Sequence, residues 1–366
     1  MSDTPLEKEL KQMIASEGPL STAQYMALAL GHPQHGYYMG RDPFGARGDF
    51  ITAPEVSQVF GELIGIWVAS AFQMMGAPGQ INLVELGPGR GTLMADVLRA
   101  AKVMPGFLEA VDVHLVEMSP ALKQNQKVKL ANAGVRTHWH ERFEDVPGGP
   151  LIVIANEFFD ALPVHQYQFG KSGWHERMVG LDGAGNLVPG LAPDPIPPAA
   201  IPAWAGDAKA GDIIELSPER DDVAGVIAAR IAGEGGYGLF IDYGHVTSAP
   251  GDTLQALSKH SYVDIFNRPG LCDITSHVDF AALGTVFENA GAVVHGPVPQ
   301  GPFLDAMGLD LRVERLIKNA TRRQVRAIEA GVKRLASREE MGELFKVMAV
   351  SGRNNPTPAP FEGLSK

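Results

Sequence analysis

Apolar residues near the N-terminus recur at helical spacing. They predict two short helices within residues 5–30 and a longer helix from Ser57 to Met75. The residues between them, 31–54, carry several glycines and prolines and are expected to form a loop. A loop of this length inside a compact protein is often functional.

From residue 81 the pattern changes to an alternation of strands and helices. Short apolar runs at 81–86, 111–117, 135–140 and 151–155 are each separated from the next by a helical or polar stretch. The run at 151–155 has no polar residue, as expected for a strand that is buried on both faces. The alternation predicts an α/β fold with a doubly wound, mostly parallel sheet.

The alternation pauses after Pro163 and resumes with a buried strand at 238–243. Residues 165–190 are predicted to form a β-hairpin, and C-terminal helices are predicted over 303–349. These patterns divide the whole chain into five predicted segments. They are the N-terminal helices and lid loop (1–78), the first half of the core (79–164), an insertion (165–235), the second half of the core with C-terminal helices (236–350), and a tail (351–366).

The composition suits a folded enzyme that does not act on nucleic acids. Hydrophobic residues make up 45% of the 366 residues, enough for a packed core. The formal net charge is −11, whereas nucleic-acid binders usually present a basic surface. An acidic chain is better matched to a basic or neutral partner.

Cysteine content and the N-terminus indicate the compartment. With one cysteine, Cys272, neither an intramolecular disulfide nor a cysteine-based zinc site can form, which favours a reducing compartment. The N-terminus is acidic and lacks the apolar core of a signal peptide. No run reaches the ~18 apolar residues of a membrane helix. We expect a cytoplasmic protein with no membrane insertion. Two histidine pairs have spacings that metals can use but lack evident partner ligands, so no metal is expected.

The strongest motif is a glycine-rich turn between the first core strand and the helix that follows. This context makes such a turn meaningful, because glycines let the backbone turn sharply and approach a ligand. The residues that we expect to bind a cofactor here are Glu85, Gly87, Pro88, Gly89 and Gly91.

Spacing and charge distinguish between cofactors at this turn. The glycines follow G-x-G-x-G spacing, and Thr92 stands where a dinucleotide fingerprint has its third glycine. Glu85 disfavours a pyrophosphate but suits the cationic sulfonium and ammonium groups of S-adenosyl-L-methionine. S-adenosyl-L-methionine is therefore the expected cofactor, and an NAD-dependent dehydrogenase is disfavoured.

Three further residues are expected to complete the cofactor site. Glu117 ends the second strand, where a carboxylate can accept both ribose hydroxyls. Phe143 follows the third strand and is expected to stack on adenine. Asn156 follows the fourth strand, at the same edge of the sheet.

Carboxylates gather after the fourth strand, in a loop that faces the ligand crevice of a doubly wound sheet. Glu157 and Asp160 lie there with two phenylalanines. A guanidinium is hard to deprotonate, so a catalyst must orient one nitrogen and hold the charge, which carboxylates do by bidentate hydrogen bonds. Asp242 and His245 follow a further buried strand and are expected to line the acceptor pocket. His245 either takes the released proton or caps the turn.

The loop at 36–58 is predicted to form a lid, because its glycines allow movement. An ordered surface loop is the alternative. The residues expected to face the cofactor or substrate are Tyr38, Asp49, Glu55 and Gln58.

Several strings together resemble the MidA-like family. They are GDFITAPEVSQVFGE (48–62), VELGPGRGTL (84–93), NEFFDALP (156–163), DYGH (242–245) and DITSHVDF (273–280). They extend in order over nearly the whole chain, and the second and third are specific to the family, whereas a bare G-x-G-x-G is not.

This resemblance implies the class I fold of S-adenosyl-L-methionine-dependent methyltransferases. It also implies a protein arginine methyltransferase, since the mitochondrial members look like such enzymes and serve the assembly of respiratory complex I. A symmetric-type dimethylation of a core subunit of the respiratory NADH dehydrogenase is the implied reaction. Glu157 falls where arginine methyltransferases have the first glutamate of a pair. The second glutamate is absent from its usual position in this sequence, and Gln166 lies near it.

Three other functions stay open on the sequence. One is a non-enzymatic assembly factor that keeps S-adenosyl-L-methionine as a structural ligand. Another is a methyltransferase for a small molecule or nucleic acid, and the last is the disfavoured dehydrogenase. The expected partner is a protein that carries the target arginine, and a homodimer is a further expectation.

Overall fold

The structure, a computed structural model, describes residues 3–40 and 52–364, and within them an eight-stranded, mostly parallel sheet forms the core. Its strands lie in the order β15-β16-β10-β5-β2-β3-β4, with β14 paired to β10. This confirms the predicted doubly wound sheet. The strands are β2 (Ile81–Leu86), β3 (Val111–Val116), β4 (Arg136–His140), β5 (Leu151–Asn156), β10 (Gly236–His245), β14 (Val278–Asp279), β15 (Val293–Pro299) and β16 (Phe345–Ser351).

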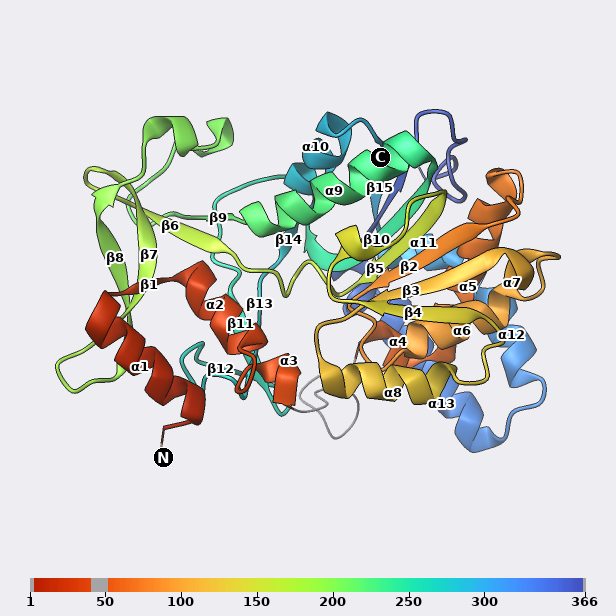
Figure 1. Ribbon diagram of the computed structural model, residues 1–366, viewed down its shortest axis with the longest axis horizontal. Helices are drawn as coiled ribbons and strands as arrows, with labels where there is room; N and C mark the ends of the chain where they lie inside the picture. Colours follow the sequence, from red (N-terminus) through yellow and green to blue (C-terminus); the bar gives the residue numbers. More distant parts are fainter. Residues whose placement is uncertain (1–2, 41–51, 365–366) are drawn as a thin grey trace. The chain divides into compact units, whose positions relative to one another are not determined.

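Helices cover both faces of this sheet. Figure 1 shows α5 (Gln58–Met74) and α6 (Thr92–Ala101) on one face, and α9 (Pro218–Glu234) and α10 (Phe280–Asn289) on the other. α5 and α6 pack closely because Gly65 carries no side chain. A Cβ atom there would lie 2.7 Å from the Cβ of Ala100.

The prediction of helices throughout 303–349 is wrong at its C-terminal end. α11 (Gln300–Ala306), α12 (Leu309–Ile317), α13 (Arg322–Ala336) and α14 (Met341–Leu344) are followed by β16, which runs antiparallel between β10 and β15. All residues of β16 are buried. Periodicity does not separate such a short apolar run from a buried helix. In the expected tail, Phe361 is buried and packs into the core.

The chain divides into two compact units. One holds this sheet and comprises the chain from α4 (Ala53–Val56) to Phe159, Val223–Val246, and the chain from Val278 onward. The other comprises α1 (Pro5–Glu17), α2 (Thr22–Gly31), α3 (Tyr37–Gly40), Asp160–Asp222 and Thr247–His277. The predicted segments 1–78 and 165–235 are therefore each split between the two units.

The second unit has a core of its own. A five-stranded sheet has the order β1-β7-β6-β9, with β8 paired to β7, and a smaller sheet has the order β12-β11-β13. Leu6 and Leu10 of α1 belong to the same buried cluster as Val179 and Leu187 of the larger sheet. This packing explains why α1 groups with a segment far along the chain. The strands are β1 (Leu20–Ser21), β6 (His165–Gly170), β7 (Gly173–Leu181), β8 (Leu187–Pro195), β9 (Ile213–Leu216), β11 (Gln255–Ser258), β12 (Ser261–Val263) and β13 (Asp273–Thr275).

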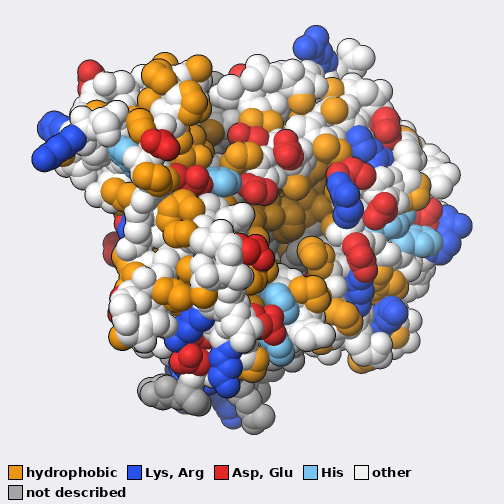
Figure 2. Space-filling model, turned by 60° about the vertical axis from the view of Figure 1, so that its left-hand side comes forward, with side chains coloured by type: hydrophobic (Ala, Val, Ile, Leu, Met, Phe, Trp, Pro, Cys, Tyr) orange, Lys and Arg blue, Asp and Glu red, His pale blue; other side chains and the backbone are white. Residues whose placement is uncertain are grey.

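The surface is charged and mixed in sign. On the face drawn in Figure 2, lysine and arginine side chains stand in small groups among acidic and uncharged residues. Within residues 3–40 and 52–364, no helix has the length and apolar character needed to cross a membrane.

Three neighbouring strands of the sheet are joined by a chain of side-chain hydrogen bonds. Asn82 Nδ2 donates to the Pro147 carbonyl (3.0 Å), so its Oδ1 is the acceptor for His114 Nε2 (3.1 Å). His114 Nδ1 lies 2.9 Å from His140 Nε2, and in a neutral His114 this nitrogen accepts from His140. Burial lowers the pKa of His114 to about 4, with the neighbouring His140 acting in the same direction. The fold therefore requires a neutral imidazole at this position.

Acidification should lower the free energy of unfolding, because it favours protonation of His114. Because its folded pKa, about 4, lies below the ordinary value of 6.5, its stabilising contribution is complete above pH 6.5. It is lost as the pH falls from 6.5 toward 4. We expect about 2 kcal/mol of this contribution to be gone at pH 5. Urea unfolding at pH 7 and pH 5 measures the loss, and His114→Phe should show a smaller difference between the two pH values. Equal differences for both proteins would contradict this assignment.

Candidate functional site

The turn after β2 is built from glycines in the left-handed region. Gly87, Gly89 and Gly91 have φ angles of 58°, 51° and 76°. The Gly87 N–H donates to the Val116 carbonyl (3.1 Å), and the Gly91 N–H donates to the Pro88 carbonyl (2.7 Å). α6 begins directly after the turn, so its first N–H groups have no partner within the helix.

The register of the parallel strands brings other predicted residues to the same edge. Leu86 of β2 lies opposite Val116 of β3 and Ala155 of β5, and Asn156 lies opposite Ile241 of β10. Because parallel strands advance together, the residues that follow emerge at one level. These are Gly87, Glu117, Glu157 and Asp242.

Glu85 is a buried carboxyl at the end of β2. Its Oε2 atom has no hydrogen-bond partner among the described residues. Burial, with a smaller contribution from the nearby Glu117 carboxylate, raises the pKa of Glu85 to about 8, and the Met94 N–H acts in the opposite direction. A buried acceptor without a partner calls for an explanation, and a cationic ligand that donates hydrogen bonds supplies one.

Glu117 is buried at the end of β3 and held by the protein. Its Oε1 accepts from the Ser119 N–H (2.8 Å), and its Oε2 accepts from Gln126 Nε2 (3.2 Å). Burial raises its pKa, and these two donors oppose the rise. The carboxylate therefore has a fixed orientation beside the glycine turn.

Glu157 adopts a backbone conformation that is rare for its residue type, with φ at 50°. Its Oε1 accepts from the Ala53 N–H (2.9 Å) and from Asn156 Nδ2 (3.1 Å). The Asn156 Oδ1 is buried and has no hydrogen-bond partner among the described residues. Strain of this kind gathers at functional sites and costs about 1–3 kcal/mol.

Asp242 and His245 both lie in the C-terminal half of β10, with different surroundings. The buried Asp242 carboxylate accepts from the backbone N–H of Phe159 (3.0 Å) and of Tyr243 (3.0 Å). It thereby ties the loop after β5 to β10. His245 Nε2 lies 3.7 Å from an Asp279 carboxylate oxygen.

Asp160 and Tyr38 belong to the other unit, where they lie near Asp273. The Tyr38 hydroxyl donates to Asp273 Oδ1 (2.8 Å). Burial raises the pKa of Tyr38 well above its ordinary value, and Asp273 and Asp160 add to the rise. The Asp160 carbonyl accepts from the Ser276 N–H (3.1 Å).

The structure does not favour Phe143 as an adenine platform. It is only 4% exposed, and the Arg230 guanidinium lies 5.2 Å from its ring centroid, which covers one ring face. Met118 directly follows Glu117 and is 60% exposed. A large apolar side chain at a ligand edge suits a flat aromatic base. The sequence carries a signal for this residue, because Met118 comes directly after the carboxylate that ends the second strand.

The predicted lid residues differ in their surroundings. Glu55 of α4 accepts from the Thr92 hydroxyl (2.6 Å) through Oε1, and its Oε2 lies 3.5 Å from Arg90. It therefore binds α4 to the glycine turn. Gln58 is exposed at the first position of α5. Asp49 lies outside the described residues.

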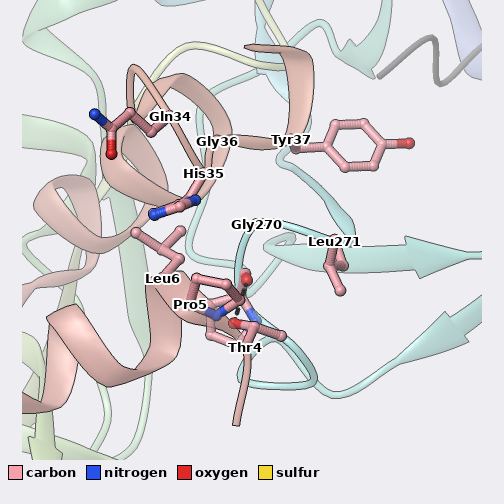
Figure 3. A pocket seen from close by; sticks show the side chains of 10 residues that line it. Thr4, Pro5, Leu6, Gln34, His35, Gly36, Tyr37, Gly270 and Leu271 are labelled. Atoms are coloured by element: carbon pink, nitrogen blue, oxygen red, sulfur yellow. Dashed lines mark hydrogen bonds between the residues drawn. The ribbon is translucent and has the colours of Figure 1, made fainter. Parts of the chain in front are cut away.

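A pocket of about 190 Å³ lies within the second unit, apart from these residues. Thr4, His35, Tyr37 and Gly270 are among the residues that line it, and Thr4 Oγ1 donates to the Pro269 carbonyl (Figure 3). None of the predicted site residues lines this pocket. Among the residues that the structure describes, no group of three or more His, Cys, Asp or Glu side chains could hold a metal ion.

Comparisons with known proteins agree with this geometry. Residues 63–298 match the model of a family described as S-adenosyl-L-methionine-dependent methyltransferases. The chain belongs to this family. S-adenosyl-L-methionine is therefore the cofactor of this methyltransferase, and the resemblance drawn from the sequence is confirmed.

Named relatives cover most of the chain. The Drosophila melanogaster protein "Protein arginine methyltransferase NDUFAF7 homolog, mitochondrial" is 38% identical, over 94% of this chain and 84% of its own. The human "Protein arginine methyltransferase NDUFAF7, mitochondrial" is 36% identical, over 95% and 83%. A Burkholderia thailandensis crystal structure with bound S-adenosyl-homocysteine has a TM-score of 0.82 and 30% identity, and covers 94% of this chain and 91% of that one.

The names of these relatives correct one expectation. We predicted a cytoplasmic protein, but the Drosophila, mouse and human relatives are all named as mitochondrial. The prediction was wrong because it depended on cysteine content, the N-terminus and the lack of a long apolar run, whereas the likeness to these relatives extends over the folded chain.

Gly87→Val should weaken cofactor binding. The new Cβ would lie 3.0 Å from Phe158 Cδ2, at a φ of 58° that valine rarely adopts. We expect the dissociation constant for S-adenosyl-L-methionine to rise roughly tenfold to a hundredfold, as measured by calorimetric titration. Gly76→Val is the matched control, because Gly76 has a φ of 80° and open space around its Cβ position. Equal effects of the two substitutions would show that the turn itself has no special role.

Proposed function

We propose that this methyltransferase transfers the methyl group of S-adenosyl-L-methionine to an arginine side chain of a protein. The observation that carries the proposal is the placement of Glu157. Its carboxylate is oriented by Ala53 and Asn156 at the sheet edge next to the glycine turn. The relatives named as protein arginine methyltransferases support the same acceptor.

The buried groups at this edge fit the cofactor. Glu85 and Asn156 have buried acceptor oxygens that suit an ammonium group, and the Glu117 carboxylate suits the ribose hydroxyls. Met118 is the proposed apolar contact for adenine, in place of Phe143. When bound, the cofactor supplies an electrophilic methyl group, and the protein's task is to align the acceptor nitrogen and hold its charge.

Glu157 is the proposed catalytic residue. Its carboxylate would accept hydrogen bonds from the substrate guanidinium and keep one nitrogen directed at the methyl group. The proposed acceptor protein is a core subunit of the respiratory NADH dehydrogenase, as the family resemblance implies, with a role in assembly of that complex. A homodimer stays a prediction.

Glu157→Gln should abolish transfer and leave cofactor binding intact. The glutamine amide oxygen can still accept from Ala53 and Asn156, so the loop keeps its geometry while the charge is lost. We expect the rate of methylarginine formation to fall at least about a hundredfold. Incorporation from methyl-labelled cofactor into a protein acceptor, followed by hydrolysis and amino-acid analysis, measures it.

Glu109→Gln, at an exposed site of the same unit, is the control for this substitution. Normal turnover by Glu157→Gln would refute the proposed role of Glu157. A wild-type protein that labels other residues but no arginine would refute the proposed acceptor.

Cofactor binding should release a proton from Glu85. With a pKa of about 8 in the free protein, the carboxyl is mostly protonated at pH 7, and a cationic ligand beside it favours the ionised form. Affinity should therefore rise with pH below 8, by up to about tenfold per pH unit. Titration in two buffers of different ionisation enthalpy counts the released proton. Glu85→Gln should release none, and a pH-independent affinity of the wild type would contradict the proposed contact.

A further inference from the structure

Gln126 lies in the middle of α8 (Pro120–Leu130) and is fully buried. Its Nε2 donates to the Gly89 carbonyl (2.7 Å) and to Glu117 Oε2 (3.2 Å). Its Oε1 accepts from the indole Nε1 of Trp139 on β4 (2.9 Å). One amide group thus joins the glycine turn, the end of β3, and β4.

The surrounding groups allow only one orientation of this amide. A backbone carbonyl only accepts hydrogen bonds, so the Gly89 side requires the NH₂ group. An indole N–H only donates, so the Trp139 side requires the amide oxygen. A flipped amide would place a donor against a donor and an acceptor against an acceptor. Gln126 is therefore fixed by its neighbours.

Gln126 is also in close contact with the glycine turn. A Cβ atom on Gly91 would lie 3.3 Å from Gln126 Cγ, so there is little space between the helix and the turn. The Ser119 N–H that donates to the Glu117 carboxylate belongs to the backbone. Gln126 is the side-chain donor, and it holds the Glu117 oxygens and the Gly89 carbonyl at a fixed separation.

We infer that Gln126 is a positioning residue for the cofactor, which orients the Glu117 carboxylate toward the ribose hydroxyls and sets its distance from the glycine turn. This inference rests on the contact between Glu117 and the ribose that we propose above. Gln126 does not touch the cofactor in this arrangement; it acts through Glu117 and Gly89.

Gln126→Leu tests the inference, because it removes all three hydrogen bonds with little change in volume. S-adenosyl-homocysteine and its 2′-deoxyribose analogue are the probes in calorimetric titration. We expect Gln126→Leu to weaken binding of S-adenosyl-homocysteine on the order of tenfold. The affinity ratio, that for S-adenosyl-homocysteine divided by that for the analogue, should fall close to the ratio of Glu117→Gln. Gln124→Leu, at an exposed position of the same helix, should leave both affinities unchanged.

The ratio separates positioning from a general loss of structure. A structural defect would weaken both probes equally and leave the ratio at the wild-type value, which would overturn the inference. If Glu117→Gln also keeps the wild-type ratio, the proposed ribose contact is wrong and the inference is overturned with it. If Glu117→Gln lowers the ratio and Gln126→Leu does not, only the inference about Gln126 is wrong.

Trp139→Phe provides an independent arm, which also decides the matter if Gln126→Leu does not fold. This substitution keeps the two hydrogen bonds that Gln126 Nε2 donates. It removes the indole N–H that donates to Gln126 Oε1 and so orients the amide. We expect a smaller loss of affinity, about twofold to fivefold, with a reduced ratio of the two probes. Unchanged affinities and an unchanged ratio for Trp139→Phe would overturn the inference.

Discussion

The parallel register of four neighbouring strands is the constraint on which the site depends. β3, β2 and β5 end at one level, where Asn156 lies opposite Ile241 of β10, so residues from distant parts of the sequence lie together. A shift by one residue would turn every side chain to the opposite face, and would separate Glu117 from the glycine turn. The buried apolar runs inside the strands therefore determine where the polar residues beyond them lie.

Burial of two acids at this edge is the second requirement. Glu85 and Glu117 are both buried, and each ionised form disfavours the other. The protein hydrogen-bonds the Glu117 carboxylate through Ser119 and Gln126 but leaves one oxygen of Glu85 without a partner among the described residues. A cation bound here would replace the proton on Glu85 and stabilise both carboxylates. This arrangement is costly for the free protein and favourable for a cationic cofactor.

Much of this site could be predicted from the sequence because its residues follow strands directly. Glu85, the glycine turn, Glu117 and Glu157 each stand at the end of an apolar run, and these runs are visible in the sequence. Gln126 was out of reach, because a glutamine inside a helix gives no local sign that it is buried. Its role depends on Trp139 and Gly89, which come near it only in the folded chain.

Local sequence patterns also did not reveal β16 or the division into two units. β16 is an apolar run with both faces covered, so its pattern resembles that of a buried helix. The division of residues 1–78 between two units depends on contacts between α1 and strands that come more than 150 residues later, a separation that periodicity does not report.

The carboxylates at the sheet edge differ in what their hydrogen bonds achieve, although the sequence presents them as equivalents. Asp242 accepts from two backbone N–H groups, and those bonds tie the loop after β5 to β10. Glu55 in the same way connects α4 to the glycine turn. Glu157 accepts from Ala53 and Asn156 through Oε1, from a left-handed backbone that a structural tie would not require. The strained backbone of Glu157 is explained if its carboxylate must face a substrate. Because Asp242 instead fastens two segments of the backbone, Glu157 is favoured over Asp242 as the group that acts on the acceptor.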